Sequence, residues 1–161
     1  MNIINPSFRI ITPIDRVAIL REIELAGRTC YKSENRITEE SSPKFVSMLV
    51  SRGHEAMLEH SSLSVRFIID RGVSHELVRH RLCSFAQEST RYCNYSDDKF
   101  GNELTFIKPL FWSLDSELYS TWKESCQQVE NSYFKMLDRG AYPQEARSIL
   151  PNSLKTEIVV T

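Results

Sequence analysis

The alternation of side chains from residue 62 to residue 69 is the feature that most constrains how this chain folds. Every second residue from Leu63 to Ile69 is apolar, and the positions that alternate with them begin with Ser62, Ser64 and Arg66. Successive side chains of a β-strand point to opposite faces, so this spacing predicts a strand with one buried face. A sheet with a buried face needs a second layer of structure packed against it.

Extended and helical patterns alternate along the rest of the chain. Strands or extended stretches are also predicted at residues 7–11, 89–95, 104–107 and 154–161. Helices are predicted at about residues 12–30, with Thr12 as the N-cap, and at 42–53, 73–82, 115–139 and 143–150. These segments predict an α/β (α+β) fold, a twisted, mostly antiparallel sheet flanked by helices, as a single domain over residues 1–161. The last strand pattern ends abruptly on Val-Val-Thr, which indicates that a partner strand, helix or tail is missing.

The composition argues against several classes of protein. Apolar residues make up 41% of the chain and charged residues 25%, which is typical of soluble globular proteins. The net charge of −1 argues against nucleic acid or an anionic membrane surface as a partner. Without a visible signal peptide, the four irregularly spaced cysteines indicate reduced thiols, and a cytoplasmic protein is expected. The histidines and cysteines lack zinc-site spacing, so no metal site is predicted.

The side chains best suited to ligand binding or catalysis are concentrated between positions 75 and 95. The segment from Arg79 to Arg91 holds three arginines and one acid, Glu88, in a nearly neutral chain. Successive helical residues are rotated by about 100°. Arg79, His80 and Arg81 are therefore expected to fan out at a helix C-terminus, where the macrodipole favours cations. The five glycines form neither a dinucleotide fingerprint nor a P-loop, so side chains and helix ends must hold any nucleotide.

A second group of polar side chains follows this run. If the segment is extended, Ser89 and Arg91 share one side and Thr90 faces the other. A hydroxyl beside a guanidinium suits a phosphate, because both donate hydrogen bonds. The alternative is a solvated face in which the arginines pair with Glu76 and Glu88. The residues alone lead to an anion site, with phosphate as the expected ligand.

The spacing Arg-His-Arg-x7-Ser, formed by Arg79-His80-Arg81 and Ser89, resembles the signature of flavin-dependent thymidylate synthases. Three further segments resemble parts of that family in the same order. They are the flavin-proximal segment 53–60, the nucleotide loop 87–92, and a later phosphate-contacting segment with Ala146-Arg147, Leu150-Pro151 and Thr156. The resemblance covers nearly the whole chain.

The resemblance implies an enzyme that methylates dUMP to dTMP. Methylenetetrahydrofolate would donate the carbon, and FAD reduced by NADPH would supply the hydride, in a homotetramer with shared active sites. The residues that it assigns to dUMP are Glu76, Leu77, Val78, Arg79, Gln87, Glu88, Ser89, Thr90, Arg91 and Arg147. Those that it assigns to FAD are His54, Ala56, Arg79, His80, Arg81 and Gln87. The arginine that activates the uracil ring in the family is expected beyond Thr161, so no catalytic residue is identified in this chain.

Other interpretations stay open. The chain could be a non-catalytic nucleotide-binding or assembly remnant of such an enzyme. A nucleic-acid-binding domain is disfavoured, because the chain has no wider basic stripe. Cys83 and Cys93 are expected to be structural thiols, since neither has a base placed to activate it. Because family members usually continue past Thr161, we expect the 161-residue chain alone to bind FAD weakly and to turn over poorly.

Overall fold

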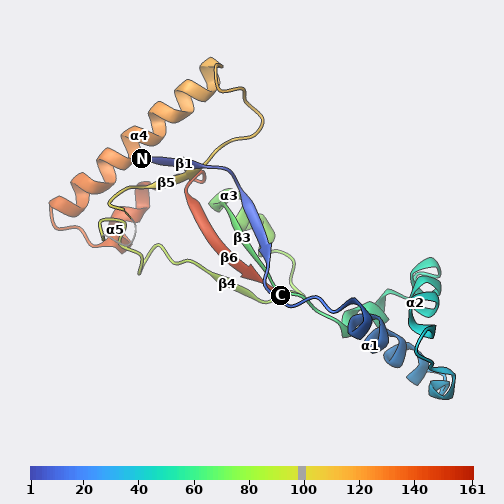
Figure 1. Cartoon of the computed structure of the whole chain (residues 1–161). Helices are drawn as coiled ribbons and strands as arrows, with labels where there is room; N and C mark the ends of the chain where they lie inside the picture. The colour runs from blue at the N-terminus through green and yellow to red at the C-terminus, as the bar shows by residue number, and fades with distance from the viewer. Residues whose placement is uncertain (98–100) are drawn as a thin grey trace. The chain divides into compact units, whose positions relative to one another are not determined.

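The computed structural model describes residues 1–97 and 101–161, which group into two compact units (Figure 1). The sheet unit consists of Met1–Arg9 and Val65–Thr161, and the helical unit consists of Ile10–Ser64. The chain therefore leaves the sheet unit after its first residues and returns to it at Val65. No linker rich in Gly, Ser or Pro marks either crossing point, which is why the sequence predicts one domain.

The sheet unit contains a four-stranded sheet in the order β2 (Ser7–Ile10), β3 (Val65–Asp70), β6 (Lys155–Val160) and β4 (Phe85–Gln87). Strand β6 is antiparallel to both of its neighbours. Its register with β3 runs from Val65 opposite Val160 to Asp70 opposite Lys155. A smaller pair joins β1 (Asn2–Ile4) in parallel to β5 (Thr105–Ile107). The predicted combination of helices with a mostly antiparallel sheet is confirmed.

The side chains of strand β6 alternate between a buried face and a partly exposed face. Thr156 and Ile158 are fully buried, whereas Lys155 and Glu157 on the other face are partly exposed. Just before β6, Leu154 is fully buried and bridges to Phe106 of β5. The main apolar cluster consists of Tyr95, Leu104, Phe106, Cys126, Tyr133, Ala146 and Leu154.

Helices complete the sheet unit. Helix α3 (Arg71–Leu77) begins directly after β3, and the Asp70 carboxylate accepts the Val73 N–H at 2.7 Å as its N-cap. Helix α4 (Glu117–Asp138) is the long helix that lies beside β1 and β5 in Figure 1. The buried Glu130 of α4 accepts the Leu104 N–H at 2.8 Å and pairs with the Met1 ammonium at 3.1 Å. The short helices α5 (Pro143–Ala146) and η4 (Arg147–Ile149) follow.

The helical unit pairs two helices and two 3-10 turns. These elements are α1 (Arg16–Thr29), η1 (Glu34–Arg36), α2 (Ser41–Ser51) and η2 (Glu55–His60). Ile23, Val46 and Leu49 form its buried core. A Cβ at Gly27 would lie 2.8 Å from the Phe45 ring, so glycine at this position allows α1 and α2 to approach closely. In residues 1–97 and 101–161, every helix is too short or too polar to cross a membrane.

Three local predictions are wrong. Asp15, and not Thr12, caps α1, because the Thr12 hydroxyl accepts the Ser64 N–H at 2.7 Å while the Asp15 carboxylate accepts two N–H groups of the first turn. Helix α3 ends at Leu77 and does not reach residue 82. The stretch 89–95 is built from turns, and the strand of this region is the short β4 that precedes it.

Candidate functional site

The Arg79-His80-Arg81 run lies in a turn that follows α3. The N–H groups of Arg79 and His80 donate to the carbonyls of Glu76 and Leu77 at 3.0 and 3.2 Å. All three side chains of the run are exposed. The predicted fan around a helix is therefore wrong, because the backbone turns before the run begins. The turn still fixes the backbone and presents three cationic or protonatable side chains to solvent.

Gln87, at the start of the predicted nucleotide loop, is held by hydrogen bonds to buried side chains. Its amide nitrogen donates to the Ser74 hydroxyl at 2.8 Å and to the Thr156 hydroxyl at 3.2 Å. Ser74 lies on α3 and Thr156 on β6, and both are fully buried. Gln87 therefore joins three elements, and its contacts with dUMP and FAD stay predictions.

The Glu88 carboxylate points toward the protein interior, where it accepts three hydrogen bonds. One oxygen accepts the Tyr95 hydroxyl at 3.1 Å. The other accepts the Lys155 ammonium at 3.1 Å and the Glu157 N–H at 3.2 Å. Burial raises the pKa of Tyr95, and the Glu88 charge raises it further. Burial works to lower the pKa of Lys155, but hydrogen bonds and charge from Glu157 and Glu88 outweigh it, so this pKa is raised.

Residues 89–92 form a tight turn in place of the predicted strand. The Ser89 carbonyl accepts the N–H groups of Tyr92 and Cys93 at 3.2 and 3.0 Å. The Ser89 hydroxyl accepts the Arg91 N–H at 3.3 Å. Ser89 and Arg91 are therefore brought together by the turn, not by a shared strand face. The Arg91 guanidinium lies 5.4 Å from the centre of the Tyr92 ring and is exposed.

The structure brings Arg147 to this turn from a distant part of the sequence. Its guanidinium lies 3.5 Å from the hydroxyl of Thr90, which is 57 residues away in the chain. Thr90 is buried, whereas Arg147 is exposed. The Arg147 Nε donates to the Gln144 carbonyl at 3.2 Å, which fixes its direction. The turn 89–92 therefore has two exposed guanidinium groups, one from Arg91 within it and one from Arg147 beside Thr90. This arrangement suits a phosphate.

Sequence reasoning missed two cations of this region. The Arg71 guanidinium lies 3.5 Å from the Glu88 carbonyl. Lys155 binds Glu88 across 67 residues of sequence. The spacing of Lys155 and Glu157 carried a signal, because opposite charges two residues apart share one face of a strand. Nothing in the local sequence indicated Arg71.

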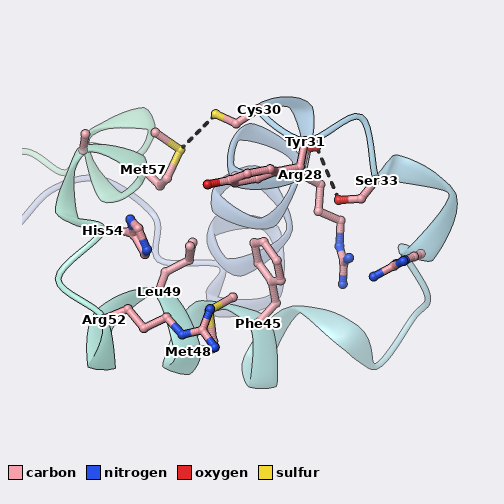
Figure 2. Close-up of a pocket in the computed structure, with 13 residues that line it drawn as sticks. Arg28, Cys30, Tyr31, Ser33, Phe45, Met48, Leu49, Arg52, His54 and Met57 are labelled. Atoms are coloured by element: carbon pink, nitrogen blue, oxygen red, sulfur yellow. Dashed lines mark hydrogen bonds between the residues drawn. The ribbon is translucent and has the colours of Figure 1, made fainter.

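The helical unit contains a cavity of about 520 Å³ (Figure 2). Its lining residues are Gly27, Arg28, Cys30, Tyr31, Ser33, Arg36, Phe45, Met48, Leu49, Arg52, His54, Ala56 and Met57. Three arginines and one histidine belong to this set, and it contains no carboxylate. Aromatic and thioether side chains supply apolar surface. Such a cavity suits a ligand that combines an aromatic ring with negative charge.

The two residues that the sequence assigned to FAD in this unit, His54 and Ala56, both line the cavity. Gly53, with a φ of 70°, ends α2 in the left-handed region that favours glycine. The Gly53 and His54 N–H groups donate to the carbonyls of Val50 and Leu49 at 3.1 and 3.0 Å. This C-terminal capping pattern turns the chain at the helix end and places His54 on the cavity wall. All other predicted site residues belong to the sheet unit.

A buried ion pair orients Arg28 on the cavity wall. The Glu24 carboxylate is fully buried and accepts the Arg28 Nε at 2.7 Å and the Ser41 hydroxyl at 2.8 Å. The Arg28 guanidinium also lies 4.4 Å from the centre of the Phe45 ring. Arg28 was not predicted, although the spacing of Glu24 and Arg28 by four residues is that of a helical ion pair. In the described part of the chain, no three His, Cys, Asp or Glu side chains cluster as metal ligands would.

The family model described as "Thymidylate synthase complementing protein" matches residues 14–161. The chain belongs to this family. The matched range therefore includes most of the helical unit and most of the sheet unit.

Relatives named "Flavin-dependent thymidylate synthase" are similar to this chain in sequence. The protein of Pyrococcus furiosus is 34% identical over 152 residues, which cover 92% of this chain and 61% of the relative. The protein of Pyrococcus horikoshii is 40% identical over 130 residues, which cover 76% of this chain and 52% of the relative. The chain spans about half to three-fifths of the length of the curated relatives that it matches.

A solved structure has the same fold. The UMP/dUMP methylase PolB from Streptomyces cacaoi, bound with 5-Br dUMP, matches with a TM-score of 0.78 and 19% identity. The match covers 99% of this chain and 74% of that chain. The fold of this chain is thus shared with that of the methylase.

Proposed function

We propose that this chain carries the nucleotide-binding and part of the flavin-binding machinery of an enzyme that methylates dUMP to dTMP. Methylenetetrahydrofolate is the proposed carbon donor, and FAD reduced by NADPH is the proposed source of hydride. Membership of the family, relatives named for flavin-dependent thymidylate synthesis and a structural neighbour named as a dUMP methylase support this proposal.

The observation that carries the proposal is the convergence of Thr90 and Arg147. The family resemblance assigned both residues to the nucleotide, and their side chains lie 3.5 Å apart although 57 residues separate them. We propose that Arg91 and Arg147 bind the phosphate with charge-assisted hydrogen bonds, and that the Ser89 hydroxyl helps to orient the nucleotide. Glu88 has its carboxylate engaged by internal donors, so its proposed role is to hold the turn.

The cavity of the helical unit fits part of a flavin nucleotide in chemical character. Phe45 and Met48 offer apolar contacts for a ring, and Arg36 and Arg52 offer positive charge for phosphates. His54 adds a ring N–H donor. A bound flavin would supply the hydride that completes the methyl group. The chain's own residues would bind it, orient it and reduce the access of water to it. Ala56, Arg79, His80, Arg81 and Gln87 remain the further proposed contacts.

The assembly is proposed to be a homotetramer in which subunits share active sites. Glu76, Leu77 and Val78 lie beside the exposed Arg79–Arg81 turn. They are proposed to contact dUMP together with that turn. The same exposed turn is proposed to serve FAD as well, because three neighbouring side chains leaving one turn can address two ligands.

Titration of the purified chain with dUMP and with FAD tests both sites separately. Calorimetry should detect dUMP binding, and Arg147→Ala should raise the Kd for dUMP by about tenfold, the effect expected when one charge-assisted hydrogen bond is lost. Arg52→Ala should weaken FAD binding and leave dUMP binding unchanged. Arg139→Ala, a change of an exposed arginine outside both sets, serves as the control. Equal dUMP affinity of wild type and Arg147→Ala would contradict the phosphate site.

A turnover assay separates an enzyme from a non-catalytic remnant. NADPH oxidation that depends on dUMP, together with formation of dTMP, is the result expected of an enzyme. Since the 161-residue chain alone is expected to turn over poorly, flavin absorbance that is strengthened by dUMP is the second criterion for an enzyme. Binding of dUMP with neither flavin binding nor dTMP formation would favour the nucleotide-binding or assembly module.

A further inference from the structure

We propose that Lys155 is a positioning residue for the nucleotide phosphate, a role that rests on the proposed dUMP site. Its ammonium neutralises Glu88 and holds that carboxylate against β6. The residue is not expected to touch the ligand.

The contacts of Lys155 form a chain of alternating charges in the sheet unit. The ammonium lies 3.1 Å from Glu88 and 2.6 Å from Glu157. Glu157 in turn pairs with Arg66 of β3. Lys155 and Glu88 are both largely shielded, with 18% and 12% of their side chains exposed. An ion pair with so little exposure is weakly screened, so the charge of Lys155 matters more than that of a surface lysine.

Glu88 is where this chain of charges meets the proposed phosphate site. Glu88 and Thr90 are two residues apart, so their Cα atoms are separated by at most about 7 Å. That distance is within one Debye length, about 8 Å at physiological ionic strength. An unpaired carboxylate at position 88 would therefore repel a phosphate held near Thr90 and Arg147. It would also lie next to a second carboxylate, that of Glu157.

Removal of Lys155 has two expected effects. The first is repulsion between an uncompensated Glu88 and the bound anion. The second is a weaker connection between the turn and β6, because the carboxylates of Glu88 and Glu157 would repel each other while only the backbone bond from the Glu88 N–H to the Glu157 carbonyl, at 2.9 Å, is kept. Loss of the Glu88 charge in the same protein should reverse both effects. The side-chain amide introduced by Glu88→Gln could still accept the Glu157 N–H with its carbonyl oxygen, while its NH2 group donates to the Tyr95 hydroxyl, which can also act as an acceptor.

Four variants test this role through dUMP affinity measured by calorimetry. Lys155→Met should raise the Kd for dUMP by about tenfold, or about 1.4 kcal/mol. Lys155→Arg should bind like the wild type, because it keeps the cation. Lys135→Met is the control, because it removes the same charge from an exposed position of α4. The double variant Glu88→Gln/Lys155→Met should recover most of the lost affinity, and a packing role for Lys155 predicts no such recovery.

Deoxyuridine, which lacks the phosphate, supplies a second readout. Its binding should be nearly the same in Lys155→Met and in the wild type. Thermal unfolding confirms that each variant is folded at the titration temperature. Two results would overturn the role of Lys155 while leaving the proposed dUMP site standing. One is a Kd for dUMP in Lys155→Met equal to that of the wild type, and the other is a double variant that binds dUMP no better than Lys155→Met.

Titration with inorganic phosphate separates this role from the proposed function. If the wild type fails to bind dUMP but binds phosphate in a Lys155-dependent way, the nucleotide assignment fails and the role of Lys155 stands. If the wild type binds neither, both fail.

Discussion

Replacement of Glu24 by alanine removes a fully buried charge from the helical unit and leaves Arg28 without its ionic partner. The Arg28 side chain is only 11% exposed, and its Nε lies 2.7 Å from the carboxylate. Removing one member of a buried pair costs about 3–5 kcal/mol. The lower end applies here, because the guanidinium borders the cavity and can gain water there. The Ser41 hydroxyl adds little, since it can still donate to the Thr38 carbonyl at 3.1 Å.

A destabilisation of about 3 kcal/mol is large against the roughly 5–15 kcal/mol that typically stabilise a domain. With a urea m-value of about 1–3 kcal/mol per molar, the unfolding midpoint should fall by about 1–3 M. Urea unfolding followed by circular dichroism measures this shift. Amide hydrogen exchange in α1 reports the helical unit separately.

Glu22→Ala is the matched control, because Glu22 is an exposed carboxylate on the same helix. It should change the free energy of unfolding by no more than about 0.5 kcal/mol. Glu24→Gln, which keeps volume and one acceptor, should fall between the two. A midpoint for Glu24→Ala equal to that of Glu22→Ala would refute the reasoning that this ion pair stabilises the unit.

Two further outcomes follow from the sheet unit. Burial works to raise the pKa of Glu157, but hydrogen bonds from Lys155 and Arg66 outweigh it, so this pKa lies below its ordinary value of 4.5. The stabilisation from Glu157 should thus be present above pH 4.5 and be lost as the pH falls through the folded-state pKa. Urea unfolding as a function of pH measures this loss, and Glu157→Gln should make the acid limb shallower. Thr90→Val keeps the volume of the side chain but removes the acceptor next to Arg147. It should raise the Kd for dUMP by about three- to tenfold in calorimetry, and an unchanged Kd would show that Thr90 does not orient Arg147.

Elements with strong local signals were predictable from the sequence. The alternation around Val65 and Phe67 predicted β3, because a period of two matches the geometry of a strand and not that of a helix. The long helix α4 ends close to Gly140, whose φ of 91° is the left-handed conformation expected after a helix. The resemblance also indicated the correct family, because it used four segments and their order.

The predictions that failed either had no turn signal in the local sequence or depended on contacts distant in sequence. Residues 78–82 include neither Gly nor Pro, so no local signal indicated that α3 ends at Leu77. The turn at 89–92 likewise lacks both residues. Local hydrogen bonds to Ser89 close it, and the adjacent Glu88 is bound by Lys155, which lies 67 positions later. The approach of Arg147 to Thr90 is equally non-local, and the cavity of the helical unit needs α1 and α2 to be packed before its lining exists.

The charged face of β6 has a consequence for folding fidelity. A slip of one residue along β3 would turn Lys155 and Glu157 into the apolar core and expose Ile158 to water. Burying unpaired charges is so unfavourable that such mispaired species should be scarce during refolding. The alternating charges across these strands thus favour the native alignment of β3 with β6 over alignments shifted by one residue.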